Sequence, residues 1–195
     1  MITSLDQLDL NARYTYADYL KWHTEEYVEL IRGKIFRMAA PSSNHQYISM
    51  NLSFKIRGYL SKSPCAVFAS PFDVRLPHYS EKKNKEIMTV VQPDICVICD
   101  KSKIDAKGCL GAPDLIIEIL SQGNTKKEMK DKYSIYEESG VKEYWIIYPG
   151  EKSMMRFVLN EQGKYIGLQP LTEDDTVTTP ILPGLEISLM EVFER

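Results

Sequence analysis

The sequence lacks the features that would tie the protein to a membrane or to a disulfide framework. No apolar run reaches the roughly 18 residues that read as a spanning helix, so no membrane segment is expected. The start of the chain, MITSLDQLDL, carries acids where a signal peptide has basic and then apolar residues, so we expect a cytoplasmic protein. Four cysteines in 195 residues do not make a disulfide scaffold, and we expect reduced thiols.

An excess of positive charge is also missing. Lys and Arg total 24 against 27 Asp and Glu, which gives a net charge of −3. Bulk positive charge is therefore excluded as the means of holding nucleic acid or a membrane. The acids are concentrated near the end, where residues 171–195 carry −5, so the other 170 residues carry +2 and allow a locally basic surface.

Length and pattern indicate a single domain over residues 1–195. A chain of this size buries enough surface to fold without a metal or disulfide staple. The expected elements are a helix from Thr15 to about His23 with Asp18 as its capping acid, a hairpin over 27–38 turning at Arg32-Gly33, a helix over 45–60, strands over 65–77, 90–99 and 114–120, a helix over 125–139 ending at Gly140, a strand over 143–149 and a C-terminal β-meander. This order predicts an α/β or α+β fold with one mixed sheet flanked by helices.

Glu118 fits a plain hydrophobic core poorly. It interrupts the apolar run LIIEIL at residues 115–120, and such a run is typical of a strand covered on both faces. An ionised carboxylate there is costly unless a metal, a cationic side chain or a proton compensates it. Strand alternation places Asp114, Ile116 and Glu118 on one face. Glu118 is therefore either half of a buried structural ion pair or part of a functional site.

Asp94 repeats this anomaly at the start of the apolar run 95–98. It follows Pro93, a residue that suits the first position of a strand. Taken alone, Asp94 is a turn residue at a strand end. Taken with Glu118, it puts two acids into adjacent apolar strands, and a divalent cation explains both. Carboxylates with open water positions favour Mg²⁺ or Mn²⁺.

Lysines are frequent on the helix expected over 125–139. Its inward stripe consists of Met129, Tyr133 and Tyr136. Lys132 lies about 40° from Tyr136, at the edge of this stripe. Its ammonium either faces the strand carboxylates or reaches water while the stem covers apolar surface. The start of the helix carries Lys126, Lys127 and Lys130. These lysines either form a solvated face or contact a phosphate group.

The remaining polar residues have simpler interpretations. His45 lies beside the apolar stripe of its helix, and a satisfied core histidine is the simpler interpretation; Glu29, a hairpin-edge acid, is interpreted in the same way. That stripe consists of Ile48, Leu52, Ile56 and Tyr59. Cys96 and Cys99 cannot both coordinate one zinc ion, because residues i and i+3 of a strand face opposite sides of the sheet. The sequence has no P-loop, dinucleotide fingerprint or G-x-S-x-G elbow.

Several motifs taken together resemble the Uma-two family, a bacterial family of restriction-endonuclease-like proteins in the PD-(D/E)xK nuclease superfamily. The matching segments are ELIRGKI (29–35), PSSNH (41–45), QPD (92–94), GAPDLIIEILS (111–121), Lys132 with Tyr136, GVKEYW (140–145) and LPGL (182–185). The resemblance covers nearly the whole chain and implies a restriction-endonuclease-like mixed sheet.

The resemblance also implies roles for single residues. Asp94 would be the first acid of the nuclease motif and Glu118 the second. The superfamily's lysine stands two residues after the second acid, where this chain has Leu120. The family is thought to use a lysine displaced onto the following helix, and Lys132 fits that place. Further family positions near the site are Asp114, Glu29 and His45.

The resulting hypothesis is Mg²⁺- or Mn²⁺-dependent hydrolysis of phosphodiester bonds, in DNA by resemblance. Asp94 and Glu118 would hold the metal, with the carbonyl of residue 119 or water completing its ligands, and Lys132 would orient water and stabilise phosphoryl charge. Backbone phosphates would be contacted by Lys126, Lys127 and Lys130. A weakly acidic domain needs a homodimer or a basic groove to hold DNA. The alternatives are a non-catalytic nucleic-acid-binding module and a hydrolase of another phosphate ester.

Overall fold

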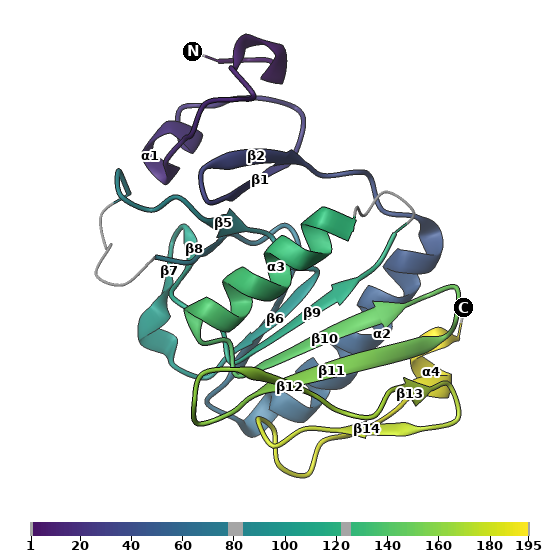
Figure 1. Cartoon of the computed structure of the whole chain (residues 1–195). Coiled ribbons are helices and arrows are strands. Elements are labelled where there is room, and N and C mark those ends of the chain that lie inside the picture. The colour runs from purple at the N-terminus through teal and green to yellow at the C-terminus, as the bar shows by residue number, and fades with distance from the viewer. Residues whose placement is uncertain (1, 78–83, 122–125, 195) are drawn as a thin grey trace.

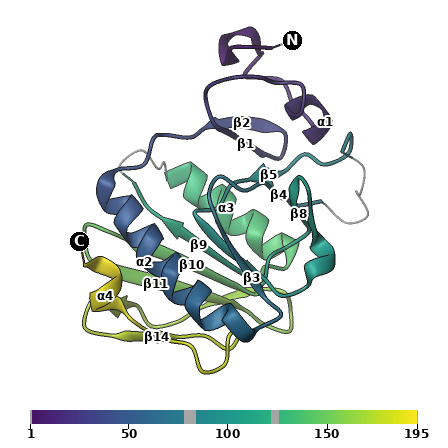
Figure 2. The same cartoon turned by 180° about the vertical axis from the view of Figure 1, so that it is seen from behind.

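Two long helices cover the two faces of a central mixed sheet (Figure 1). The computed structural model describes residues 2–77, 84–121 and 126–194, with the backbone alone at residues 126 and 127. The helices are α2 (Ser43–Tyr59) and α3 (Lys126–Ser139). Figure 2, seen from behind, shows α2 on the face of the sheet opposite to α3.

The central sheet has seven strands within the described residues, in the order β12-β11-β10-β9-β6-β3 with β13 beside β11. Its inner strands are β6 (Ile95–Ile98), β9 (Leu115–Ile119) and β10 (Glu143–Tyr148). The outer strands are β3 (Ala66–Ala69), β11 (Ser153–Leu159), β12 (Tyr165–Gly167) and β13 (Leu171–Thr172). Strands β9 and β10 are parallel, so α3 is their crossover, whereas β6 is antiparallel to β9.

Alternation along β9 divides its side chains between the two helices. One core joins β9 to α2 and contains Leu115, Ile117, Ile119, Ile48, Leu52 and Ile56. The other core joins β9 to α3 and contains Ile116, Ile135 and Tyr136. Since Glu118 shares the parity of Ile116, it is directed at α3.

A second sheet carries the N-terminal part of the chain. Its order is β2-β1-β5-β4-β8-β7. The strands are β1 (Val28–Ile31), β2 (Lys34–Arg37), β4 (Val74–Arg75), β5 (Val90–Val91), β7 (Ile104–Asp105) and β8 (Gly108–Leu110). The short helices η1 (Leu5–Gln7) and α1 (Tyr16–Tyr19) pack beside the β1–β2 hairpin (Figure 1).

The C-terminal part closes the core on the α2 side. Strands β14 (Thr176–Thr178) and β15 (Glu186–Ser188) form a two-stranded sheet, and α4 (Leu189–Phe193) lies beside α2 (Figure 2). The remaining short helices are η2 (Leu60–Lys62) and η3 (Lys101–Lys103).

The α+β class predicted from the sequence is confirmed, and so are three local predictions. Thr15 and Asp18 form the reciprocal capping box of α1, although this helix is only four residues long. The hairpin turns at Arg32 and Gly33, both of which have positive φ, as a type I′ turn requires. Helix α3 ends at Gly140, which has a φ of 83°.

The predicted mixed central sheet flanked by helices is confirmed, but it is not the single sheet that was expected, because two predicted strands each divide between two sheets. The stretch 65–77 becomes β3 of the central sheet and β4 of the second sheet, separated at Pro71. The stretch 90–99 becomes β5 and β6, separated at Pro93. Proline has no amide hydrogen to donate to a β-ladder, so each ladder is interrupted where the chain changes sheet.

Two helical stripes are rotated relative to the prediction. Tyr59 is 39% exposed, and Leu60 in η2 takes the buried place beyond Ile56. On α3 the buried residues are Lys132, Ile135 and Tyr136, so Lys132 lies in the middle of the inward face rather than at its edge.

Cys65 and Cys99 form a disulfide, so the prediction of reduced thiols is wrong for this pair. Strand β3 pairs antiparallel with β6, with Ala66 opposite Ile98, and the next residues outward are the two cysteines. Cys96 and Cys109 are buried free thiols. Disulfides are rare in the cytosol, so this bond does not support the expected cytoplasmic location.

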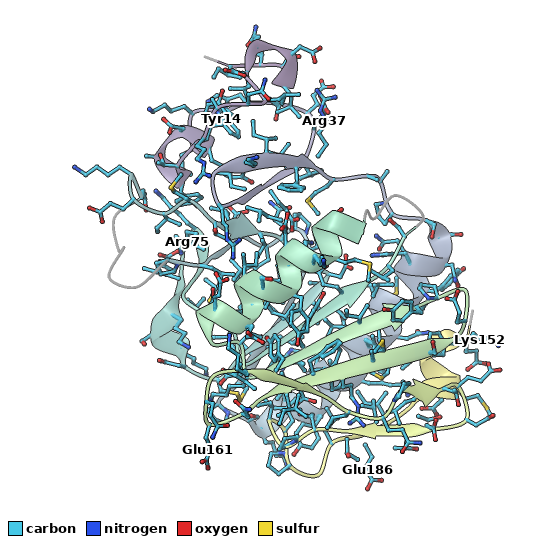
Figure 3. All side chains as sticks on the ribbon, viewed as in Figure 1. Tyr14, Arg37, Arg75, Lys152, Glu161 and Glu186 are labelled. Atoms are coloured by element: carbon cyan, nitrogen blue, oxygen red, sulfur yellow. A yellow bond between two sulfur atoms is a disulfide. The ribbon has the colours of Figure 1, made fainter. Side chains whose placement is uncertain are left out.

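Charged side chains at the edges of the structure include Lys152, Glu161 and Glu186 (Figure 3). Arg75 differs from them, since it is 3% exposed and pairs with Asp105 at 2.7 Å. No helix in the described part of the chain is long and apolar enough to cross a bilayer.

Candidate active site

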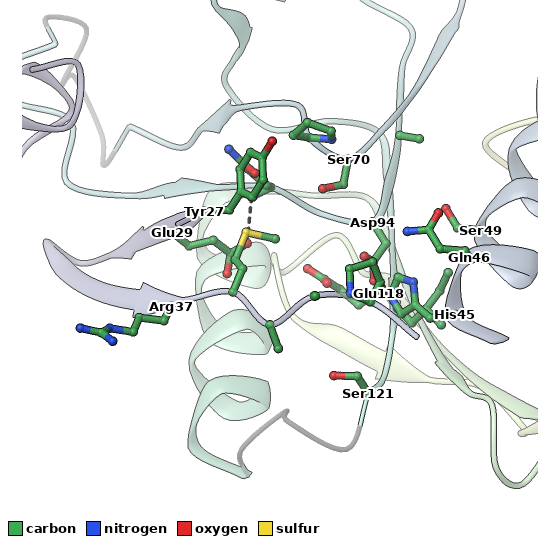
Figure 4. A pocket seen from close by; sticks show the side chains of 18 of the residues that line it. Tyr27, Glu29, Arg37, His45, Gln46, Ser49, Ser70, Asp94, Glu118 and Ser121 are labelled. Atoms are coloured by element: carbon green, nitrogen blue, oxygen red, sulfur yellow. Dashed lines mark hydrogen bonds and ion pairs between the residues drawn. The ribbon is translucent and has the colours of Figure 1, made fainter. Parts of the chain in front are cut away.

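A pocket of about 760 Å³ lies where the β1–β2 hairpin, the first half of α2, the neighbouring ends of β6 and β9, and α3 meet (Figure 4). Its lining is rich in acids, namely Glu25, Glu26, Glu29, Asp94, Glu118 and Glu128. Among the described residues, the basic side chains that line it are Arg37, His45 and Lys132. Five of the six residues that the sequence singled out as catalytic or additional site residues therefore reach one pocket.

Glu118 lies near the end of β9 and faces α3. One of its oxygens, Oε1, accepts hydrogen bonds from the Tyr136 hydroxyl at 2.6 Å and from Lys132 Nζ at 3.1 Å. Burial is the largest influence and raises the pKa of Glu118 to about 7; the Lys132 charge lowers it, while the charges of Asp94 and Glu29 raise it. The carboxylate thus sits among more negative charge than one ammonium balances.

Asp94 precedes β6 and lies beside the end of β9. Its Oδ2 accepts the backbone N–H of Ile119 at 2.7 Å. Its Oδ1 lies 3.1 Å from His45 Nε2 on α2. Because β6 and β9 are neighbours, these contacts bring Asp94 next to Glu118, as Figure 4 shows.

His45 is buried near the start of α2, where the Ser42 hydroxyl accepts its backbone N–H at 3.2 Å. Burial lowers the pKa of His45, but the hydrogen bond and charge of Asp94 more than offset this, so its pKa is raised. His45 therefore orients Asp94 from the α2 side of the sheet, a more specific placement than a satisfied core histidine.

Lys132 supplies the ammonium of the site. It is 6% exposed, and its Nζ lies 3.1 Å from Glu118 Oε1 and 3.0 Å from Glu29 Oε2. Burial lowers the pKa of Lys132, but the adjacent charges of Glu118 and Glu29 raise it well above its usual value. Of the two interpretations offered by the sequence, the structure matches the ammonium that faces the strand carboxylates.

Asp114 does not reach the pocket, although it shares the Glu118 face. It precedes β9, at the other end of the strand. Its carboxylate accepts from Lys142 Nζ at 2.7 Å and from the backbone N–H of Cys99 at 2.7 Å. Lys130 is exposed on α3, while the side chains of Lys126 and Lys127 fall outside the described residues.

Sequence reasoning missed two members of the site. The sequence places Tyr136 in an apolar stripe and gives its hydroxyl no role, although Tyr136 stands four residues after Lys132 and is one of the positions that resemble the family. Gln92 donates its backbone N–H to Glu29 Oε1 at 2.8 Å, a contact between distant segments that no local pattern encodes.

The pocket retains unused hydrogen-bonding capacity. Three buried atoms of its lining residues have no hydrogen-bond partner among the described residues: His45 Nδ1, Ser53 Oγ and Gln92 Oε1. Buried polar atoms are normally satisfied, so these atoms indicate a place for water or a ligand.

Comparisons with known proteins agree with this architecture. The family model Uma2, described as "Putative restriction endonuclease", matches residues 16–190. Among solved structures, the chain is similar to one described as a "putative nuclease belonging to DUF820 from Anabaena variabilis ATCC 29413", with a TM-score of 0.71 and 23% identity, over 92% of this chain and 97% of that chain. No curated protein matches the chain.

Proposed function

The chain belongs to the Uma2 family, as its sequence motifs implied, and from this premise we propose that the protein is a metal-dependent nuclease that hydrolyses phosphodiester bonds in DNA. The observation that carries the proposal is the meeting of Asp94 and Glu118 in one pocket with the Lys132 ammonium beside them. Paired carboxylates with an adjacent cation are suited to holding a metal and a phosphate together.

The residues of the pocket fit a divalent cation. When ionised, Asp94 and Glu118 carry two negative charges while Glu29 pairs with Lys132, which leaves an excess of negative charge that one divalent ion would neutralise. Burial and the neighbouring charges of Asp94 and Glu29 together raise the pKa of Glu118.

Asp94 and Glu118 would supply two ligands of such an ion. No group of three or more His, Cys, Asp or Glu side chains in the described ranges is arranged to hold a metal unaided. Mg²⁺ usually keeps several waters and binds through one or two carboxylates plus substrate phosphates, so two carboxylates suffice. When bound, the ion would lower the pKa of a coordinated water and neutralise phosphate charge.

The chain's own residues would perform the remaining work. The N–H of Ile119 and the His45 ring fix the Asp94 carboxylate from two sides. The Tyr136 hydroxyl fixes Glu118 through its Oε1. Lys132 would orient the attacking water and stabilise negative charge that develops on the phosphoryl oxygens.

The family description bears on the substrate, and the charge of the pocket bears on the assembly. The family description favours DNA, and the acidic lining of the pocket disfavours binding of a polyanion by electrostatics alone. We therefore include a homodimer in the proposal, since a second copy would supply further phosphate contacts.

Incubation with supercoiled DNA and Mg²⁺ or Mn²⁺ tests the proposal. Wild type should nick or linearise the plasmid, while Asp94→Ala, Glu118→Ala and Lys132→Ala should be inactive. Equal cleavage by all four proteins would indicate a contaminating nuclease. A non-catalytic binding module would instead bind DNA without cleaving it. Calorimetry would then detect no Mn²⁺ binding in wild type that is lost in Glu118→Gln.

A further inference from the structure

Lys132 is held by three carboxylates that differ in distance and in the element that carries them. Its Nζ lies 3.0 Å from Glu29 Oε2, 3.1 Å from Glu118 Oε1 and 3.9 Å from Glu128 Oε1. Glu118 belongs to the proposed metal pair, so its contact with Lys132 would be shared with the ion. Glu128 lies on α3 four residues before Lys132 and is the most distant of the three carboxylates, so its contact with Lys132 does not by itself place the lysine relative to the sheet.

Glu29 can hold Lys132 relative to the sheet without belonging to the proposed metal pair. It lies on β1, outside α3 and outside the metal pair, and it is 1% exposed. Its second oxygen, Oε1, accepts the backbone N–H of Gln92 at 2.8 Å. Gln92 stands two residues before Asp94, so one carboxylate ties the lysine on α3 to the segment that carries the first metal ligand.

We propose that Glu29 is a positioning residue of the site: one of its oxygens holds the Lys132 ammonium against the sheet, and the other holds the segment that leads to Asp94. This rests on the proposed nuclease function for its effect on turnover, whereas the contact with the ammonium is measurable without turnover. A misplacement of about 1 Å in a catalytic group lowers rates by roughly a hundredfold, so the loss should appear in the chemical step.

The test variant is Glu29→Gln, which preserves shape and leaves the acceptor for Gln92 but removes the charge opposite Lys132. We expect kcat for plasmid cleavage to fall by about tenfold or more, with KM for DNA and the Kd for Mn²⁺ within about threefold of wild type. Glu137→Gln is the matched control, because Glu137 also lies on α3 and pairs with a lysine, Lys164 at 2.7 Å, but does not line the pocket; its kcat should stay within about threefold of wild type. Glu118→Gln should instead lose Mn²⁺ binding.

A second measurement reads the contact directly. The ¹⁵N–¹H correlation of a lysine ammonium is visible when burial and hydrogen bonding slow its exchange with water, and Lys132→Met identifies the signal of Lys132. This signal should be present in wild type and in Glu137→Gln and absent or broadened in Glu29→Gln. If Glu29→Gln does not fold, Glu29→Asp keeps the charge but withdraws it by one methylene, and it should weaken the same signal.

The outcomes separate the two proposals. Persistence of the ammonium signal in Glu29→Gln, or unchanged kcat in that variant, would overturn the positioning role. Loss of Mn²⁺ affinity equal to that of Glu118→Gln would overturn it as well, because Glu29 would then be a ligand. If wild type cleaves nothing, the nuclease proposal fails, and the ammonium signal still decides whether Glu29 holds Lys132.

Discussion

Replacement of Lys132 by methionine should destabilise the protein strongly. The substitution keeps the apolar stem and removes a buried ammonium that lies 3.0 Å from Glu29 and 3.1 Å from Glu118. Two buried carboxylates then lack their cation, and breaking a buried pair in this way costs about 3–5 kcal/mol. For a chain of this length, about 1 kcal/mol shifts Tm by roughly 2–4 °C, so a decrease of about 6–20 °C is expected.

Thermal unfolding followed by circular dichroism measures this effect, and Lys21→Met is a suitable control. Lys21 also pairs with a carboxylate, Asp18 at 3.3 Å, but its side chain is 72% exposed. The loss for that variant should stay below about 1 kcal/mol. The double variant Lys132→Met with Glu29→Gln should regain part of the lost stability, since it removes one unbalanced charge.

A Tm decrease for Lys132→Met no larger than that for Lys21→Met would refute the reasoning. It would mean that the two carboxylates of the pocket bind protons or water at little cost when the lysine is absent. The proposed charge imbalance, and with it the argument for a divalent cation, would then lose its basis.

Three further predictions concern the metal, the thiols and a tight backbone approach. Mn²⁺ at about 100 times its Kd should stabilise the wild type by about 2.7 kcal/mol, seen as a rise in Tm, and Glu118→Gln should show no such rise. A thiol reagent should react with no cysteine in the native protein, with two after unfolding and with four after unfolding and reduction. Two cysteines form the disulfide, and burial protects the two free thiols and raises their pKa. Rapid labelling of the native protein would contradict this. Gly108→Ala should fail to give folded protein, because its Cβ would lie 2.1 Å from the carbonyl oxygen of Asp73, and a normal circular dichroism spectrum would show that this approach is wrong.

The acids and the lysine of the site could be predicted because each breaks a local pattern. Glu118 interrupts an apolar strand, and Asp94 stands at the start of another. Lys132 stands at the edge of the inward stripe expected for an amphipathic helix. A charge inside an apolar run is visible in the sequence, since the cost of burying it applies wherever its partners come from.

The partners themselves could not be predicted, because they depend on packing between distant segments. Glu29 looks like an edge acid of a hairpin, and it is buried only because α3 packs over that hairpin. The disulfide between Cys65 and Cys99 depends on the register of β3 against β6. The division of the strands between two sheets depends on which neighbours the segments after Pro71 and Pro93 find.

The central sheet is fastened unequally at its two ends. At the end away from the pocket, the Cys65–Cys99 bond joins β3 to β6, and Asp114 accepts from the backbone of Cys99 and from Lys142. At the pocket end the strands are joined by hydrogen bonds alone: the N–H of Ser70 donates to the carbonyl oxygen of Asp94 and the N–H of Ile119 donates to its carboxylate. Thermal fluctuations that separate these strands should therefore begin at the pocket end, because the covalent bond holds β3 and β6 together at the other end. Amide exchange would be fastest beside the carboxylates, where a nucleic acid strand would need room to enter.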